Sequence, residues 1–64
     1  MKIIGYDACI LDVHGIVEEQ GAVIFGTLEE AAQDALKLAK ECGLHPADAM
    51  TRTVYDDGVR SINY

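Results

Sequence analysis

The residues best suited to chemistry are two histidines, two cysteines and an aspartate, and their spacing limits what they can do. Asp12 and His14 form an Asp-x-His pair, which can relay a proton to a nearby nucleophile. His14, however, precedes Gly15 in a predicted turn, and no nucleophile lies close to it in the sequence. An alternative is a metal site built from Asp12, His14 and His45, but this spacing matches no zinc motif. We therefore expect a solvated turn histidine, no metal site and no catalytic residue.

The two cysteines, Cys9 and Cys42, are too few and too far apart for a disulfide framework or a Cys-x-x-Cys site. Cys9 lies in an apolar, strand-like stretch, and Cys42 lies on the apolar face of a predicted helix. The sequence also has no phosphate-binding glycine loop, His-Glu-x-x-His motif or nucleophile elbow. We expect two reduced, buried thiols in a cytoplasmic protein that has no cofactor and is not an enzyme.

Acidic pairs are the more informative polar feature. Eleven acidic residues stand against five basic ones, and the net charge of −6 argues against direct binding to nucleic acid or to an anionic membrane. Glu29 and Glu30 open the predicted helix, and Asp56 and Asp57 occupy a predicted turn. If the helix returns over the sheet, both pairs lie at one end of the domain and form a patch. Such a patch can bind Lys or Arg residues of a partner. The alternative is that these acids only stabilise a helix start and a turn.

The elements that must position these residues begin with one helix. Thr27 and Glu30 form a capping box, and Gly43 suits the left-handed residue that ends a helix. Between them an apolar arc faces one side at 100° per residue, and we expect all of it to cover a sheet. Its members are Leu28, Ala31, Ala32, Ala35, Leu36, Leu38, Ala39 and Cys42.

Two hairpins flank the helix. Residues 2–13 alternate as a strand whose core face is predicted to carry Ile4, Tyr6, Ala8 and Ile10. A turn at 14–15 returns residues 16–25 along it, with Val17, Val23 and Phe25 on the core face. A break at 18–21, giving three short strands, is the alternative. After Pro46 stops the helix, residues 51–55 and 59–64 form a second hairpin around Asp56-Asp57-Gly58, with a loop of two or three residues.

The chain is therefore expected to form a single domain over residues 1–64, an α+β fold of the order ββαββ. One amphipathic helix packs on a four-stranded, mostly antiparallel sheet. The opposite sheet face is predicted to expose a set of apolar side chains, which favours a second copy or another protein covering it. These residues are Ile3, Leu11, Val13, Ile16 and Ile24. No segment approaches the ~20 apolar residues of a membrane span.

Three resemblances bear on function. Residues 26–31, Gly-Thr-Leu-Glu-Glu-Ala after a strand pair, resemble the strand-to-helix junction of HicB-type antitoxins, which implies a subunit that sequesters a small toxin. The order of elements is similar to the β-grasp layout of immunoglobulin-binding domains such as protein L. A short acidic chain of this layout also resembles phage anti-CRISPR inhibitors, some of which mimic nucleic acid with acidic side chains.

Together these features predict a small, acidic, non-catalytic protein-binding module of the kind that phages and mobile elements use as inhibitors. Its partner would be a protein with a basic, nucleic-acid-binding surface, and the residues expected to contact it are Glu29, Glu30, Asp56 and Asp57. The alternatives are a HicB-like antitoxin subunit and a homodimeric structural module.

Overall fold

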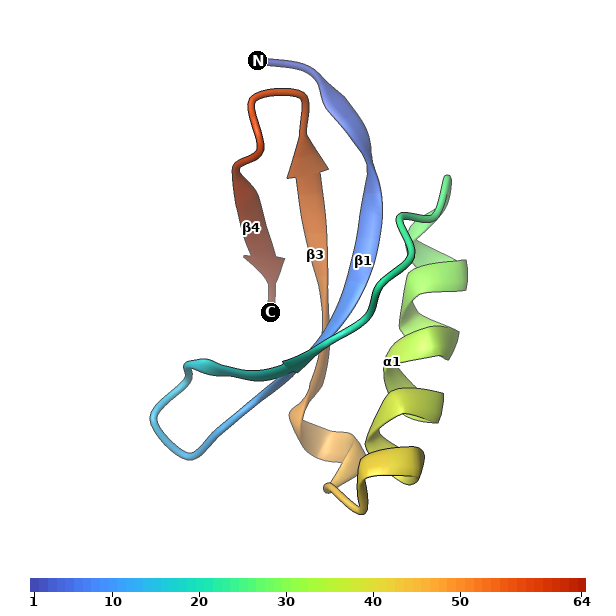
Figure 1. The fold of residues 1–64 in the computed structure, drawn as a ribbon, viewed down its shortest axis with the longest axis vertical. Helices are drawn as coiled ribbons and strands as arrows, with labels where there is room; N and C mark the ends of the chain where they lie inside the picture. The colour runs from blue at the N-terminus through green and yellow to red at the C-terminus, as the bar shows by residue number, and fades with distance from the viewer.

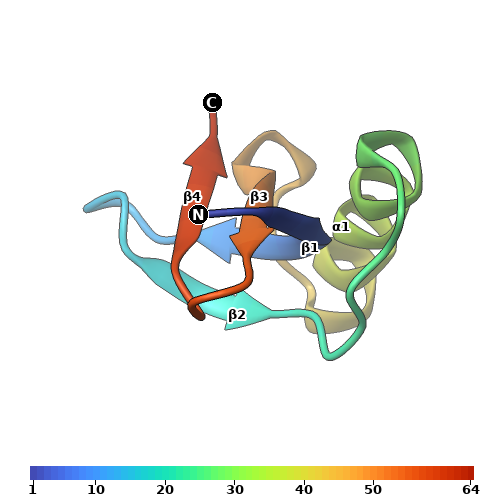
Figure 2. The ribbon, with the colours of Figure 1, turned by 90° about the horizontal axis from the view of Figure 1, so that it is seen from above.

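One helix packs against one face of a four-stranded antiparallel sheet, as predicted (Figures 1 and 2). The computed structural model describes residues 1–64. The sheet order is β2-β1-β3-β4, so the two hairpins lie side by side and the first and third strands are central. The elements are β1 (Ile3–Leu11), β2 (Val17–Gln20), α1 (Leu28–Cys42), the short 3₁₀ helix η1 (Pro46–Asp48), β3 (Ala49–Tyr55) and β4 (Arg60–Asn63).

Both ends of α1 lie where the capping residues predict. The hydroxyl of Thr27 accepts the Glu30 backbone N–H at 3.3 Å and donates to the Glu30 carboxylate at 2.9 Å. At the other end Gly43 adopts φ 68°, and the N–H of Leu44 donates to the Ala39 carbonyl at 2.8 Å. These bonds satisfy backbone groups that a helix leaves unpaired at its termini.

Of the apolar arc of α1, only three alanines are buried in the core of the domain. Ala31, Ala35 and Ala39 are buried, and α1 lies against β1 and β3. Leu28 is 47% exposed and Leu36 is 53% exposed, so the prediction that the whole arc covers the sheet is wrong. The alanine stripe explains this outcome, because it brings the helix axis close to the sheet and leaves longer side chains at the rim. Ala32 and Cys42, which the arc also included, are exposed as well.

The first hairpin turns at the predicted place, but its loop has three residues, 13–15, and not the two predicted, since the Asp12 N–H donates to the Ile16 carbonyl at 2.8 Å. Its second strand is also short. Gly15 adopts φ 76°, and a carboxylate oxygen of Asp12 accepts the N–H groups of His14 and Ile16 at 2.8 and 3.0 Å. β2 then pairs with β1 only as far as Gln20. The strand predicted over residues 16–25 is thus interrupted, but the interruption begins at Gly21, because Glu18, Glu19 and Gln20 belong to β2.

Beyond the interruption, the chain rejoins β1 at one isolated bridge between Tyr6 and Phe25. Gly5 permits this approach, since a Cβ there would lie 2.6 Å from the Phe25 carbonyl oxygen. Val23 is 52% exposed, so its predicted place on the core face is wrong. On β1 itself Ala8 and Ile10 are fully buried, whereas Ile4 is 53% exposed near the strand's start.

The second hairpin has a three-residue loop. The Tyr55 N–H donates to the Val59 carbonyl at 2.9 Å, and the Gly58 N–H donates to the Tyr55 carbonyl at 3.0 Å. Gly58 has φ 87°, which completes a type I turn followed by a left-handed residue.

The sheet face away from α1 is only partly apolar and exposed. Ile3, Val13, Ile16 and Ile24 are 45% exposed or more, but Leu11 is buried and only Ile3 of the exposed four belongs to a strand, so the predicted apolar set does not form on this face. These exposed residues lie near the start of β1, in the hairpin turn and in the β2–α1 connection. The centre of the face is polar and buried, and it is described below. α1 has 15 residues, and no helix is long and apolar enough to cross a membrane.

Candidate functional site

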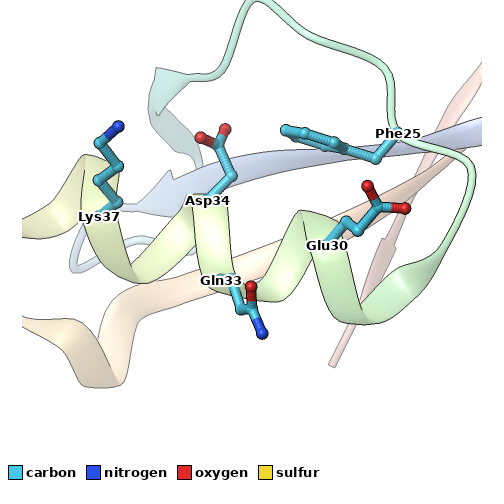
Figure 3. A pocket seen from close by; sticks show the side chains of 5 residues that line it. All are labelled: Phe25, Glu30, Gln33, Asp34 and Lys37. Atoms are coloured by element: carbon cyan, nitrogen blue, oxygen red, sulfur yellow. The ribbon is translucent and has the colours of Figure 1, made fainter.

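An open groove of about 240 Å³ lies between α1 and the connection that precedes it. Its lining residues are Phe25, Glu30, Gln33, Asp34 and Lys37. Figure 3 shows the Phe25 ring and the carboxylates of Glu30 and Asp34 on the same side of the helix, while Gln33 points away. The two carboxylates are one helical turn apart, so they lie along one edge of the groove.

The position of Phe25 is set by the sheet. Its N–H and carbonyl both bond to Tyr6, at 2.7 and 2.9 Å, which holds the ring beside α1. Gly21 lies close to the helix as well, since a Cβ there would be 2.9 Å from a carboxylate oxygen of Asp34. Neither Glu30 nor Asp34 forms an ion pair with Lys37. The groove therefore has an aromatic wall and an unneutralised acidic rim.

The predicted acidic residues occupy the two places expected from the sequence. Glu29 and Glu30 are in the first turn of α1, and Asp56 and Asp57 are in the β3–β4 loop, all four exposed. Figure 1 shows β1 between the helix start and that loop.

The loop acids also have structural roles. The Asp56 carboxylate accepts the Lys2 backbone N–H at 3.1 Å, and Asp57 accepts the Val59 N–H at 3.1 Å. Each bond uses one oxygen of an exposed carboxylate, so the negative charge still faces solvent.

A polar cluster that sequence reasoning missed crosses the sheet on the face away from α1, with one residue from each strand. Asp7 of β1 accepts two hydrogen bonds from Arg52 of β3, both 2.8 Å long. Arg60 of β4 donates its Nε–H to the same carboxylate at 3.0 Å, and Gln20 of β2 accepts from Arg52 at 3.1 Å. The side chains of Asp7 and Arg52 are 3% and 9% exposed. We call these four residues the cross-strand cluster.

The alternation of side chains along β1 and along β3 places this cluster on one face of the sheet. Asp7 and Arg52 are direct partners across the β1–β3 ladder, so their side chains share a face. Asp7 is followed by four buried apolar residues, and this isolated charge in an apolar strand was the available signal. The cluster closes the centre of the face that the sequence predicted to be apolar.

The cluster also changes the charge balance of the surface. The only ion pairs in the structure join Asp7 to Arg52 and to Arg60. They use two of the five basic residues and one of the eleven acids. Ten acids and three lysines are left, and all ten acids are exposed or half-buried. The rest of the surface is therefore more acidic than the net charge of −6 indicates.

The remaining candidates from the sequence serve local structure. Asp12 caps the first turn through the His14 and Ile16 N–H groups, and Nδ1 of His45 accepts the Ala47 N–H at 3.0 Å. The structure brings no three His, Cys, Asp or Glu side chains together as a group that could hold a metal ion.

The two thiols lie in different surroundings. Cys9 is fully buried, as expected, and its burial raises the pKa of the thiol above that of a free cysteine. Cys42 is exposed, so the prediction that it is buried is wrong. The pKa of Cys42 is also raised, first by local desolvation and then by Glu19, Glu41 and Glu18. These carboxylates come from β2 and α1, which extends the acidic surface to the far end of the helix.

Comparison with protein-family models, with curated proteins and with solved structures finds no match for this chain.

Proposed function

We propose that this chain is a small, non-catalytic protein-binding module that docks its acidic surface on a basic surface of another protein. The observation that carries the proposal is the charge imbalance left by the cross-strand cluster. Ten acids, none of them in an ion pair, face three lysines. Like charges on one surface repel each other, and a basic partner relieves that repulsion while the field speeds association.

The contact residues proposed are Glu29, Glu30, Asp56 and Asp57. Glu30 also belongs to the acidic rim of the groove beside Phe25, where an ammonium or guanidinium group can lie between carboxylates and an aromatic ring. A protein that holds nucleic acid presents such groups in number. Within this proposal the chain acts as a phage or mobile-element inhibitor that occupies a nucleic-acid-binding site, in the manner of an acidic nucleic-acid mimic.

The test uses an arginine-rich peptide as the probe for a basic surface. Glu29 and Glu30 are changed to Gln, and Asp56 and Asp57 to Asn, so that the capping oxygens are kept while the charge is lost. Peptide affinity is measured by titration calorimetry at low and high salt. We expect the wild type to bind with an affinity that falls as salt rises, and the fourfold variant to bind at least about tenfold more weakly.

A matched control separates a local site from net charge alone. It neutralises four other exposed acids, Glu18, Glu19, Glu41 and Asp48, and so has the same net charge as the test variant. An equal loss of affinity in the two variants would show that the four proposed residues are not the site. Binding that is insensitive to salt in the wild type would overturn the electrostatic proposal itself.

A HicB-like antitoxin is the second candidate, and the unpaired outer edge of β4 favours it because a sheet edge can bind another protein. It predicts a toxin gene beside the gene for this chain and co-purification of the two products. The test is co-expression of the two genes followed by affinity purification. A stable complex with the toxin supports this candidate, and the absence of a complex contradicts it.

A further inference from the structure

The two edges of the sheet differ in how they are protected. β2 carries Glu18 and Glu19, and the β1–β2 ladder is irregular between Ile10 and Leu11. Charges and bulges are the usual means of preventing an edge strand from pairing with another chain. β4 contains neither an acidic residue nor a proline, and its one charged residue, Arg60, is turned onto Asp7. The β4 edge is thus the less protected one.

The backbone groups that β4 presents outward follow from its hairpin. Since Tyr55 and Val59 are hydrogen-bonded, alternation makes Ser61 and Asn63 the next residues bonded to β3. The N–H and carbonyl groups of Arg60 and Ile62 therefore point away from the sheet, and the same alternation, continued one residue past the end of β4, directs those of Tyr64 outward. α1 packs on β1 and β3, so it does not cover this edge.

We propose that a second copy of this chain pairs with β4 in an antiparallel arrangement centred on Ile62, joining two sheets into one of eight strands. In a twofold pairing of this edge, the residues that exchange backbone hydrogen bonds with the second copy must be the ones whose N–H and carbonyl groups point outward. With Ile62 opposite its own copy, Arg60 lies opposite Tyr64, and Ser61 lies opposite Asn63. The Ile62 pair joins two apolar side chains, and the part of Arg60 that its bond to Asp7 leaves exposed faces an aromatic ring. The Asn63 amide stays bonded to Thr51 and Thr53 of its own chain, so the Ser61–Asn63 pair adds close contact without like charges.

Side-chain exposure and charge both support a second copy as the occupant. Tyr64 is 90% exposed and the Arg60 side chain is 40% exposed, so each has surface for the other to cover. Most of the surface repels a second copy because it is acidic, but this register puts no like charges opposite each other. The acidic loops at Asp56 and Asp57 precede β4 and so lie at opposite ends of the joined strands.

Cysteine cross-linking tests the register. In a Cys42→Ser background, which removes the exposed native thiol, Ile62→Cys is expected to form a covalent dimer on mild oxidation. The Cα atoms of directly paired residues lie within the range that a disulfide spans. Ser61→Cys and Asn63→Cys are each expected to stay monomeric alone, yet to cross-link with one another when mixed. Equal dimer formation by all three single variants would mean random collision and would overturn the proposal.

Sedimentation equilibrium across micromolar to millimolar concentrations tests association without a cross-link. Tyr64→Lys removes the aromatic ring and places a cation opposite Arg60 at both symmetric positions, so we expect dimerisation about tenfold weaker or more. Tyr64 is almost fully exposed, so the thermal midpoint of a dilute, monomeric sample should be unchanged. A wild type that is monomeric at every concentration overturns the proposal, and so does a Tyr64→Lys dimer of wild-type strength.

Discussion

Replacing Asp7 with alanine tests whether the cross-strand cluster is essential to the fold. The Arg52 guanidinium is 9% exposed, and two of its hydrogen bonds end on Asp7. Without the carboxylate, Arg52 keeps only its bond to Gln20 and remains a buried, unpaired charge. Such a change typically costs ~3–5 kcal/mol. Arg60 adds little to this cost, since its side chain is 40% exposed and solvent can take over its partner's role.

That cost is large for so small a domain. At ~0.05–0.15 kcal/mol per residue, a chain of this length has a free energy of unfolding of roughly 3–10 kcal/mol. Asp7→Ala is therefore expected to be largely unfolded, or close to its unfolding midpoint, in buffer. Urea titration followed by far-ultraviolet circular dichroism measures the loss. Arg60→Ala is the control, with an expected loss of less than about 1 kcal/mol.

A double variant separates the value of the ion pair from the penalty of breaking it. Asp7→Leu with Arg52→Met removes both charges and keeps an apolar filling, and such replacements are commonly neutral or stabilising by ~1–4 kcal/mol. We expect the double variant to be far more stable than Asp7→Ala. A loss below about 1 kcal/mol for Asp7→Ala would refute the reasoning, and so would a double variant as unstable as the single one.

Four further predictions concern α1 and the thiols. Ala35→Leu should cost ~1–3 kcal/mol by overpacking the helix–sheet contact, whereas Leu36→Lys should change stability by less than about 0.5 kcal/mol, both measured by urea titration. A large loss for Leu36→Lys would mean that Leu36 belongs to the core. Gly43→Ala should cost ~1–2 kcal/mol because φ 68° disfavours a side chain, and the thermal midpoint reports it. Iodoacetamide should label Cys42 in the native protein and Cys9 only after unfolding. Since burial raises the pKa of Cys9 in the fold, the unfolded thiol ionises first, and stability should fall as the pH rises through the range in which a free thiol ionises. Cys9→Ala should remove that part of the alkaline loss; an unchanged profile would contradict it.

Local sequence signals predicted the elements well. The Thr27 cap, the Gly43 stop and the Asp-Gly turn each act over a few residues, and each lies where it was expected. The fold class followed, because one amphipathic helix between two hairpins has few ways to bury its apolar side. The acidic residues at the helix start and the β3–β4 loop were also placed correctly along the chain.

Other features depended on contacts between distant parts of the chain. The sequence pattern assigned the whole apolar arc of α1 to the core, but the close approach allowed by its alanines left Leu28 and Leu36 exposed. The sequence pattern also predicted that the sheet face away from α1 is apolar. No local signal indicates that β3 will lie beside β1 and place Arg52 opposite Asp7 on that face.

The sequence by itself determined the helix, the turns and the excess of acid, since these depend on residue type and short-range hydrogen bonds. Only the tertiary structure decided where the charges are neutralised. Asp7 meets Arg52 and Arg60 across 45 and 53 residues of chain, and that meeting requires the sheet order β2-β1-β3-β4. A buried charge must find its partner in space, so the pairing of strands, and not the spacing of residues, set both the polar centre of the sheet and the acidic surface around it.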